Sequence, residues 1–191
     1  GMRFAEQRWF AGAQELERVE VVAEEAWPGG IAWQLLELDG ARYQVVIDEQ
    51  GRDRALDPAV AMTILQRTVP GSSATEVRAM GVEQSNTSLV YDERLVVKLF
   101  RRGDDGPNLD AETTTALAGV GYDGIAPPRG VWRRDGLDLA FAQDYLPGAA
   151  DGWALATTGD AFSDDDAAAI GLATAGMHIA LAEAFGVTES G

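Results

Sequence analysis

The chain has 191 residues, enough for one compact body or two small ones with a sizeable apolar core. Its composition is 46% hydrophobic and 24% charged, which excludes intrinsic disorder and collagen-like repeats. A formal net charge of -16 makes nucleic acid and anionic membrane surfaces poor partners, and the absence of cysteine excludes disulfides, thiolate metal sites and a cysteine nucleophile.

Two features of the sequence bear on its cellular location. The first residues carry Arg3, Glu6 and Arg8 and lack the apolar segment of a secretory signal. The charge-free run from Ala167 to Ala182 is shorter than the roughly 20 apolar residues that span a bilayer. A soluble cytoplasmic protein is therefore expected.

Residues 1–70 are expected to form a small α+β cap subdomain with an antiparallel meander. Its three β-rich runs, separated by turn sequences, are Glu17 to Ala23, Ile31 to Leu38 and Ala41 to Ile47. Asp57 followed by Pro58 predicts the start of a helix. The segment from Pro70 to Ser73 is the best candidate for a linker.

Residues 71–150 are expected to form a second subdomain, a five-stranded antiparallel sheet with one helix. The predicted strands are Thr75 to Met80, Leu89 to Tyr91, Arg94 to Phe100, Gly130 to Arg133 and Leu137 to Asp144. The predicted helix runs from Pro107 to about Gly119. Residues 151–191 are expected to be a linker and a C-terminal helix.

Lys98, the only lysine in the chain, lies on the third of these strands between the apolar residues Val96 and Phe100. On the following helix, Glu112 falls on the stripe that contains Leu109, Ala116 and Leu117. A half-buried carboxylate requires a cation, and Lys98 supplies the only side-chain ammonium. The sequence therefore predicts that Lys98 and Glu112 pair.

The C-terminal helix is expected to begin after Ser163, with three aspartates in its first turn. Its predicted buried stripe is Ile170, Ala173, Met177, Leu181 and Phe185. The helix also carries the only histidine, His178, interpreted as a packing or interface residue rather than a proton shuttle.

A polar loop between two strands, a lysine on the next strand and a glutamate on the next helix have the order of a kinase-like nucleotide site. Backbone donors of such a loop and a fixed cation bind the phosphates, and the glutamate positions the cation. The loop here contains Gln84 to Ser88 where protein kinases are rich in glycine. An ordinary surface turn remains the alternative interpretation.

Five stretches resemble the N-terminal part of bacterial maltokinases. They are Gln7 to Gly12, Val82 to Ser88, Val97 to Arg102, Gly106 to Asn108 and Tyr145 to Trp153. The resemblance implies an aminoglycoside-phosphotransferase-like kinase fold behind a small cap. It also implies ATP with magnesium as cofactor, maltose as acceptor, and a place in trehalose and glycogen metabolism.

Carried over to this sequence, the resemblance assigns Lys98 as the phosphate-binding lysine and Glu112 as its helix partner. The expected phosphate loop comprises Gln84, Ser85, Asn86, Thr87 and Ser88. The expected adenine hinge comprises Gln143, Asp144, Tyr145 and Leu146.

The catalytic loop of such kinases, an aspartate usually preceded by a His-Gly pair, has no counterpart in this chain, since His178 is followed by Ile179. One hypothesis is therefore a cap and N-lobe that retain an ATP half-site without turnover alone. The alternative is a non-catalytic interaction module that binds a trehalose-pathway enzyme, a separate catalytic lobe or a second copy through the C-terminal helix.

Overall fold

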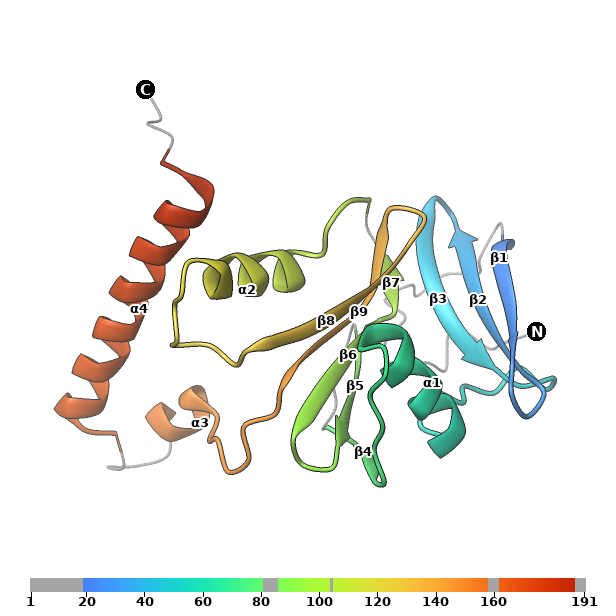
Figure 1. Ribbon diagram of the computed structural model, residues 1–191, viewed down its shortest axis with the longest axis horizontal. Helices are drawn as coiled ribbons and strands as arrows, with labels where there is room; N and C mark the ends of the chain where they lie inside the picture. The colour runs from blue at the N-terminus through green and yellow to red at the C-terminus, as the bar shows by residue number, and fades with distance from the viewer. Residues whose placement is uncertain (1–18, 81–85, 104, 158–161, 188–191) are drawn as a thin grey trace. The chain divides into compact units, whose positions relative to one another are not determined.

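The computed structural model describes residues 19–80, 86–103, 105–157 and 162–187 (Figure 1). The segment from Gln7 to Gly12 and the predicted site residues Gln84 and Ser85 lie outside these ranges.

The described residues form strands and helices in an order close to the predicted one. The strands are β1 Val19–Trp27, β2 Ile31–Leu38, β3 Ala41–Ile47, β4 Val77–Ala79, β5 Asn86–Tyr91, β6 Leu95–Phe100, β7 Arg102–Gly103, β8 Pro128–Arg134 and β9 Leu137–Asp144. The helices are α1 Pro58–Thr68, α2 Leu109–Gly119, α3 Gly152–Thr157 and α4 Asp164–Phe185.

The strands assemble into two sheets, of order β1-β2-β3-β7 and β4-β5-β6-β9-β8. The α+β class, the antiparallel cap and the five-stranded sheet predicted from the sequence are confirmed. Two details differ from the prediction. Strand β1 continues to Trp27, which pairs with Ile31 and is buried, and the short β7 joins the cap sheet by pairing with β3.

Three hairpin turns connect these strands as their sequences predict. Asp39–Gly40, Asp92–Glu93 and Asp135–Gly136 all have positive φ angles at both residues. Such turns match the right-handed twist of the strands that they join.

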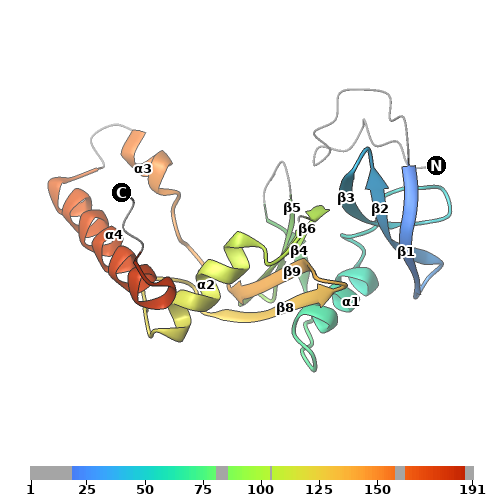
Figure 2. The same cartoon turned by 90° about the horizontal axis from the view of Figure 1, so that it is seen from above.

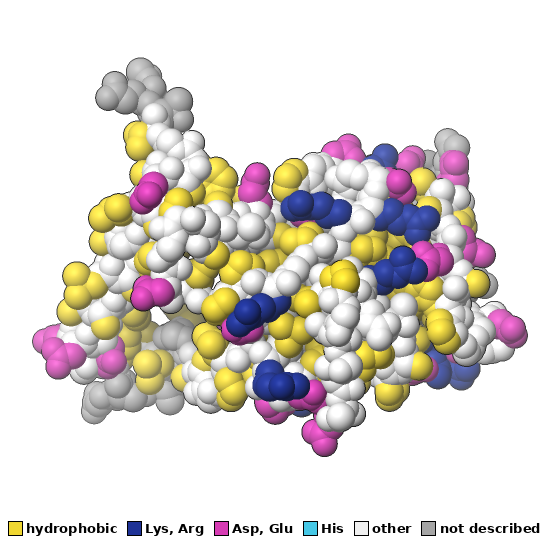
Figure 3. Space-filling view, in the orientation of Figure 1, with side chains coloured by type: hydrophobic (Ala, Val, Ile, Leu, Met, Phe, Trp, Pro, Cys, Tyr) yellow, Lys and Arg dark blue, Asp and Glu magenta, His cyan; other side chains and the backbone are white. Residues whose placement is uncertain are grey.

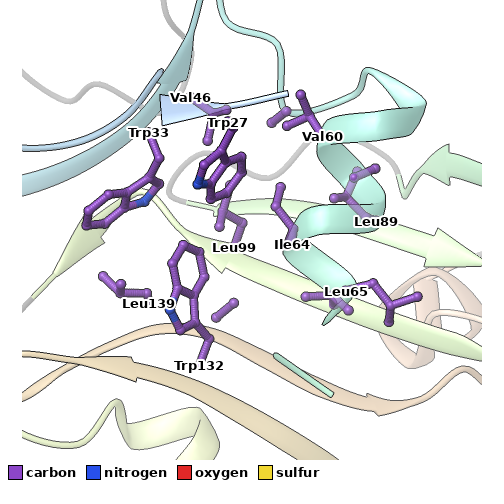
Figure 4. Close-up of a cluster of buried hydrophobic side chains, with 14 of the residues drawn as sticks. Trp27, Trp33, Val46, Val60, Ile64, Leu65, Leu89, Leu99, Trp132 and Leu139 are labelled. Carbon is purple, nitrogen blue, oxygen red and sulfur yellow. The ribbon is translucent and has the colours of Figure 1, made fainter. Parts of the chain in front are cut away.

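The two sheets and α1 share one apolar core. Helix α1 contributes Val60, Ile64 and Leu65, and the cap sheet contributes Trp27 and Trp33. Trp132 of β8 lies beside both tryptophans, with ring centroids 6.0 and 5.6 Å away (Figure 4). Asp57 is the N-cap residue of α1 as predicted, but its carboxylate accepts from Arg54 instead of capping the helix.

The chain divides into two compact units, one of Gly1–Asn108 with Arg129–Tyr145 and one of Leu109–Pro128 with Leu146–Gly191. The first unit contains both sheets and α1. The second contains α2, α3 and α4, and the short α3 was not predicted.

Helix α4 begins as predicted, with a capping box between Ser163 and Asp166. The prediction of its buried stripe was right only in part. Met177 and Leu181 are half-buried, whereas Ala173 is exposed and Ile170 and Phe185 are 51% and 55% exposed. The buried residue of the helix is Ala180, which was not predicted. Helix α2 lies beside α4 (Figure 2), and the hydroxyl of Tyr122 donates to the carbonyl oxygen of Ala173 at 2.8 Å. Within the described part of the second unit, this narrow contact covers little of the apolar circumference of α4.

Candidate functional site

Lys98 lies on the face of β6 that points away from α1. Val97 and Leu99 on the other face join the core that α1 covers, whereas Lys98 alternates with the buried Val96 and Phe100. Lys98 is half-buried. The predicted placement of a cation on an apolar strand face is confirmed.

The ladder places a serine and a phenylalanine on either side of Lys98. Ser88 of β5 is its partner in one direction and Phe141 of β9 is its partner in the other. Ser88 is only 4% exposed, and its hydroxyl has no hydrogen-bond partner among the described residues. A buried hydroxyl without a partner is costly and marks a position where a further group is expected.

The last three residues of the predicted phosphate loop form a strand instead of a loop. Asn86, Thr87 and Ser88 belong to β5 and pair with Phe100, Leu99 and Lys98. The sequence predicts that this strand begins at Leu89, because three small polar residues carry no alternating apolar pattern. Pairing with β6 overrides that local signal.

Thr87 points to the opposite face from Lys98. Its hydroxyl accepts a hydrogen bond from Nε of Arg101 at 2.8 Å. Arg101 is 2% exposed, and its Nη2 lies 2.8 Å from the carboxylate of Asp53. Burial lowers the pKa of Arg101, and the Asp53 carboxylate opposes that shift.

The predicted hinge leaves the sheet at the end of β9. Asp144 forms a two-pronged ion pair with Arg129, at 2.5 and 2.6 Å, which holds the pKa of Asp144 below its ordinary value. The hydroxyl of Tyr145 accepts from Arg78 at 3.0 Å, and the Arg78 guanidinium lies 5.4 Å from the centre of its ring. Gln143 is half-buried.

Arg78 also binds Glu93 in the β5–β6 turn, so the start of the hinge is connected to that turn. The fourth predicted hinge residue, Leu146, is exposed and belongs to the second unit.

Glu112 is exposed on α2, so its predicted place on a buried stripe was wrong. Ala111 and Leu117 are the buried residues of α2, and Leu109 is 75% exposed. The small Ala111 side chain, rather than Leu109, therefore marks the buried face. Lys98 belongs to the first unit and Glu112 to the second, so their pairing stays a prediction.

Gln44 ties the cap sheet to the strands that carry the site. This buried β3 residue accepts from Nε1 of Trp33 and donates to the carbonyl oxygens of Phe100 and Leu139. Its backbone N–H also donates to the carbonyl oxygen of Arg101. The cap is thereby hydrogen-bonded to β9 and to the end of β6 that follows Lys98.

Arg101 and Gln44 are not among the residues that the sequence predicts for the site. For Arg101 a signal existed: with period-2 alternation it follows Leu95, Val97 and Leu99 on the core side, where a guanidinium requires a buried carboxylate. For Gln44 no local signal existed, because its partners lie 11, 56 and 95 residues away along the chain.

An open cavity of about 370 Å³ lies beside β4 and the β5–β6 turn, lined in part by Thr75, Arg78 and Glu93. Among the described residues, no three His, Asp or Glu side chains gather in a way that could hold a metal ion.

Helix α4 has a further property that the charge-free run alone did not predict. Among the described helices it is long and apolar enough to cross a membrane, with a mean hydropathy of 1.4 over 18 residues. A core helix of a water-soluble protein passes the same test, so length and composition alone assign α4 no membrane role.

No family model matches the chain, but individual proteins do. A solved glucosamine kinase in complex with glucosamine, ADP and inorganic phosphate superposes with a TM-score of 0.63 at 23% identity, over 92% of this chain and 49% of that one. The chain has a kinase fold. Crystal form A of glucosamine kinase matches with a TM-score of 0.61 at 26% identity, over 86% of this chain and 46% of that one.

The sequences agree with this likeness. Glucosamine kinase of Mycolicibacterium smegmatis (strain ATCC 700084 / mc(2)155) is 31% identical over an alignment of 121 residues, and the match covers 56% of this chain and 30% of that protein. The chain thus spans about half the length of the solved relatives and less than a third of the curated one. The kinase fold implied by the maltokinase resemblance is confirmed, while the relatives are glucosamine kinases.

Proposed function

We propose that this chain is the nucleotide-binding part of an ATP-dependent sugar kinase whose acceptor is an amino sugar of the glucosamine type. The observation that carries the proposal is the position of Lys98 between Ser88 and Phe141, on one face of a five-stranded sheet. The same fold occurs in a glucosamine kinase that binds ADP. Maltose, the acceptor of the family that the sequence resembles, is the competing assignment.

In this proposal Lys98 neutralises charge on the nucleotide phosphates, and the Ser88 hydroxyl gains the partner that it lacks among the described residues. A fixed cation is what the spread charge of a phosphoryl group requires. Gln143 to Leu146 border the adenine, and Glu112 orients Lys98. Magnesium bound with ATP would neutralise part of the phosphate charge.

Phosphoryl transfer also requires a base for the acceptor hydroxyl, which this chain is not proposed to supply. His178, its only histidine, is exposed on α4 and is followed by Ile179. We therefore propose nucleotide binding without turnover by these 191 residues alone.

The test is a titration with ADP, with and without magnesium, followed by thermal unfolding. ADP at about 100 times its Kd stabilises the folded state by about 2.7 kcal/mol, or several degrees in Tm. Lys98→Met is expected to abolish that shift. Arg102→Met, which removes a cation from an exposed position on β7, is expected to retain it.

Either of two results would count against the proposal. The absence of any shift in the wild type contradicts nucleotide binding. An equal shift in Lys98→Met contradicts the role of Lys98 and leaves nucleotide binding standing.

A second candidate function, a protein-interaction module, is favoured by the surface of α4. Leu172 and Ile179 are 76% and 70% exposed, and no Lys or Arg occurs after Arg134. Figure 3 shows apolar and acidic side chains over this helix and basic ones over the sheets. An exposed apolar surface of this kind is typical of a protein–protein contact, and a second copy of this chain is the partner that can be tested directly.

This candidate is tested by sedimentation over a range of concentrations. Association that weakens in the Leu172→Gln/Ile179→Gln variant, but not in Leu56→Gln, supports self-association through α4. Leu56 is a suitable control because it is a comparably exposed leucine, 55%, of the first unit. A monomer at every concentration excludes the homodimer.

A further inference from the structure

The start of β5 contains three small polar residues in a row, Asn86, Thr87 and Ser88. Successive residues of a strand point to opposite faces, and a one-residue slip moves each side chain to the other face. Apolar alternation normally fixes which face is which. Leu89 and Tyr91 of the same strand lie in the core and set its facing. The polar triplet at its start has no apolar side chain of its own to hold that facing, so a polar contact is needed there.

Arg101 supplies that contact. Its Nε donates to the Thr87 hydroxyl at 2.8 Å, on the side of the strand that carries the buried Leu99. With Thr87 held on this side, Ser88 and Asn86 lie on the side of Lys98. The hydrogen bond therefore distinguishes the observed register from one in which Thr87 faces Lys98.

The cap holds Arg101 in place. Nη2 of Arg101 lies 2.8 Å from Asp53, whose other carboxylate oxygen accepts from the backbone N–H of Ala55. A buried ion pair adds little net stability over an apolar pair of similar size, and its best-attested use is to fix register. Asp53 lies in the loop after the cap sheet, and Arg101 binds Thr87 near the start of β5. The ion pair therefore connects this loop to β5 through Arg101.

We propose that Arg101, held by Asp53, is a positioning residue that holds the start of β5 with Asn86 and Ser88 on the strand face of Lys98. The inference rests on the proposed nucleotide site. It assigns Thr87 an anchoring role instead of a ligand contact. It also makes the Asp53 loop of the cap a determinant of nucleotide affinity.

The experiment uses Thr87→Val, which keeps the β-branched shape and removes the acceptor of Arg101. Thr68→Val is the matched control, because Thr68 is a buried threonine of α1 whose hydroxyl donates to the carbonyl oxygen of Ile64. The two readouts are the Kd for ADP, measured well below Tm, and hydrogen exchange of the β5 amides without nucleotide.

We expect Thr87→Val to raise the Kd for ADP by about tenfold, the scale of a lost hydrogen bond to a charged group, and to speed exchange at residues 86–88. Thr68→Val is expected to change neither. Unchanged Kd and exchange in Thr87→Val, or equal effects in Thr68→Val, would overturn the inference.

The exchange readout separates this inference from the proposed function. If the wild type binds no ADP, the proposed function fails, and exchange at residues 86–88 alone decides the anchoring role. Faster exchange in Thr87→Val then supports the anchor, and unchanged exchange rejects it.

Discussion

Ser88 lies directly opposite Lys98 in the ladder between β5 and β6, and its buried hydroxyl has no hydrogen-bond partner among the described residues. A buried hydroxyl that makes no hydrogen bond destabilises the nucleotide-free protein. Such positions are retained where a bound group completes the hydrogen bonding.

Ser88→Ala is therefore expected to stabilise the nucleotide-free protein by about 1 kcal/mol, because the unpaired hydroxyl is removed. The same change is expected to weaken ADP binding. Urea unfolding with and without ADP measures both effects. Lower stability without nucleotide would show that the hydroxyl is already satisfied in solution.

Gln44→Leu is expected to destabilise the first unit by about 2–4 kcal/mol, since it leaves the Trp33 N–H and the carbonyl oxygens of Phe100 and Leu139 without their partner. Gln34→Leu on the adjacent strand β2, whose amide binds Glu24 at the surface, serves as the control. Chemical denaturation followed by tryptophan fluorescence measures the free energy of unfolding of both variants. Equal effects in the two variants would contradict the role of Gln44.

Asp92 is expected to make the free energy of unfolding fall as the solution becomes acidic. Hydrogen bonds from the backbone N–H of Glu76 and from the hydroxyl and backbone N–H of Thr75 hold the pKa of Asp92 at about 2, below the ordinary 3.8. Because the folded-state pKa is lowered, the contribution is complete above about pH 4 and is lost as the pH falls towards 2.

Asp92→Asn should flatten the pH dependence of unfolding between pH 4 and 2. Asparagine accepts the positive φ of 49° at this turn as readily as aspartate, so the backbone is unchanged. A carboxyl titration by NMR provides a direct measurement. An Asp92 pKa near 3.8 in the folded protein would refute the expectation.

Gly130→Ala is expected to destabilise the first unit by about 1–3 kcal/mol or more. A Cβ at Gly130 of β8 would lie 2.2 Å from the backbone oxygen of Thr68 at the end of α1, so the helix or the strand must move. Gly103→Ala is the control, because its Cβ would meet Leu137 at an ordinary 3.7 Å. Thermal unfolding of the two variants gives the comparison, and similar Tm values would contradict the close approach.

Much of the fold could be read from local patterns. The hairpin turns at Asp39–Gly40 and Asp135–Gly136, the start of α1 at Pro58 and the capping box of α4 are each set by neighbouring residues. The buried faces of the helices were predicted less reliably than the turns and helix starts. Helix α2 is rich in Ala and Thr, so the weight given to Leu109 placed Glu112 on the wrong face.

The candidate site, too, could be predicted only in part. Alternation along β6 is a property of neighbouring residues, and it placed Lys98 between two apolar side chains on one strand face. The partners of Lys98 depend on the pairing of β5, β6 and β9, and Phe141 lies 43 residues further along the chain.

The sequence by itself determined the class of fold, the turns and the lysine that the site is built around, because short-range sterics and hydrogen bonding decide these. Only the tertiary structure decided that Thr87 meets Arg101, that Gln44 joins the cap to β6 and β9, and that Ser88 faces Lys98. Small polar residues have no local preference between two faces of a strand, so buried partners that are distant along the chain make that choice.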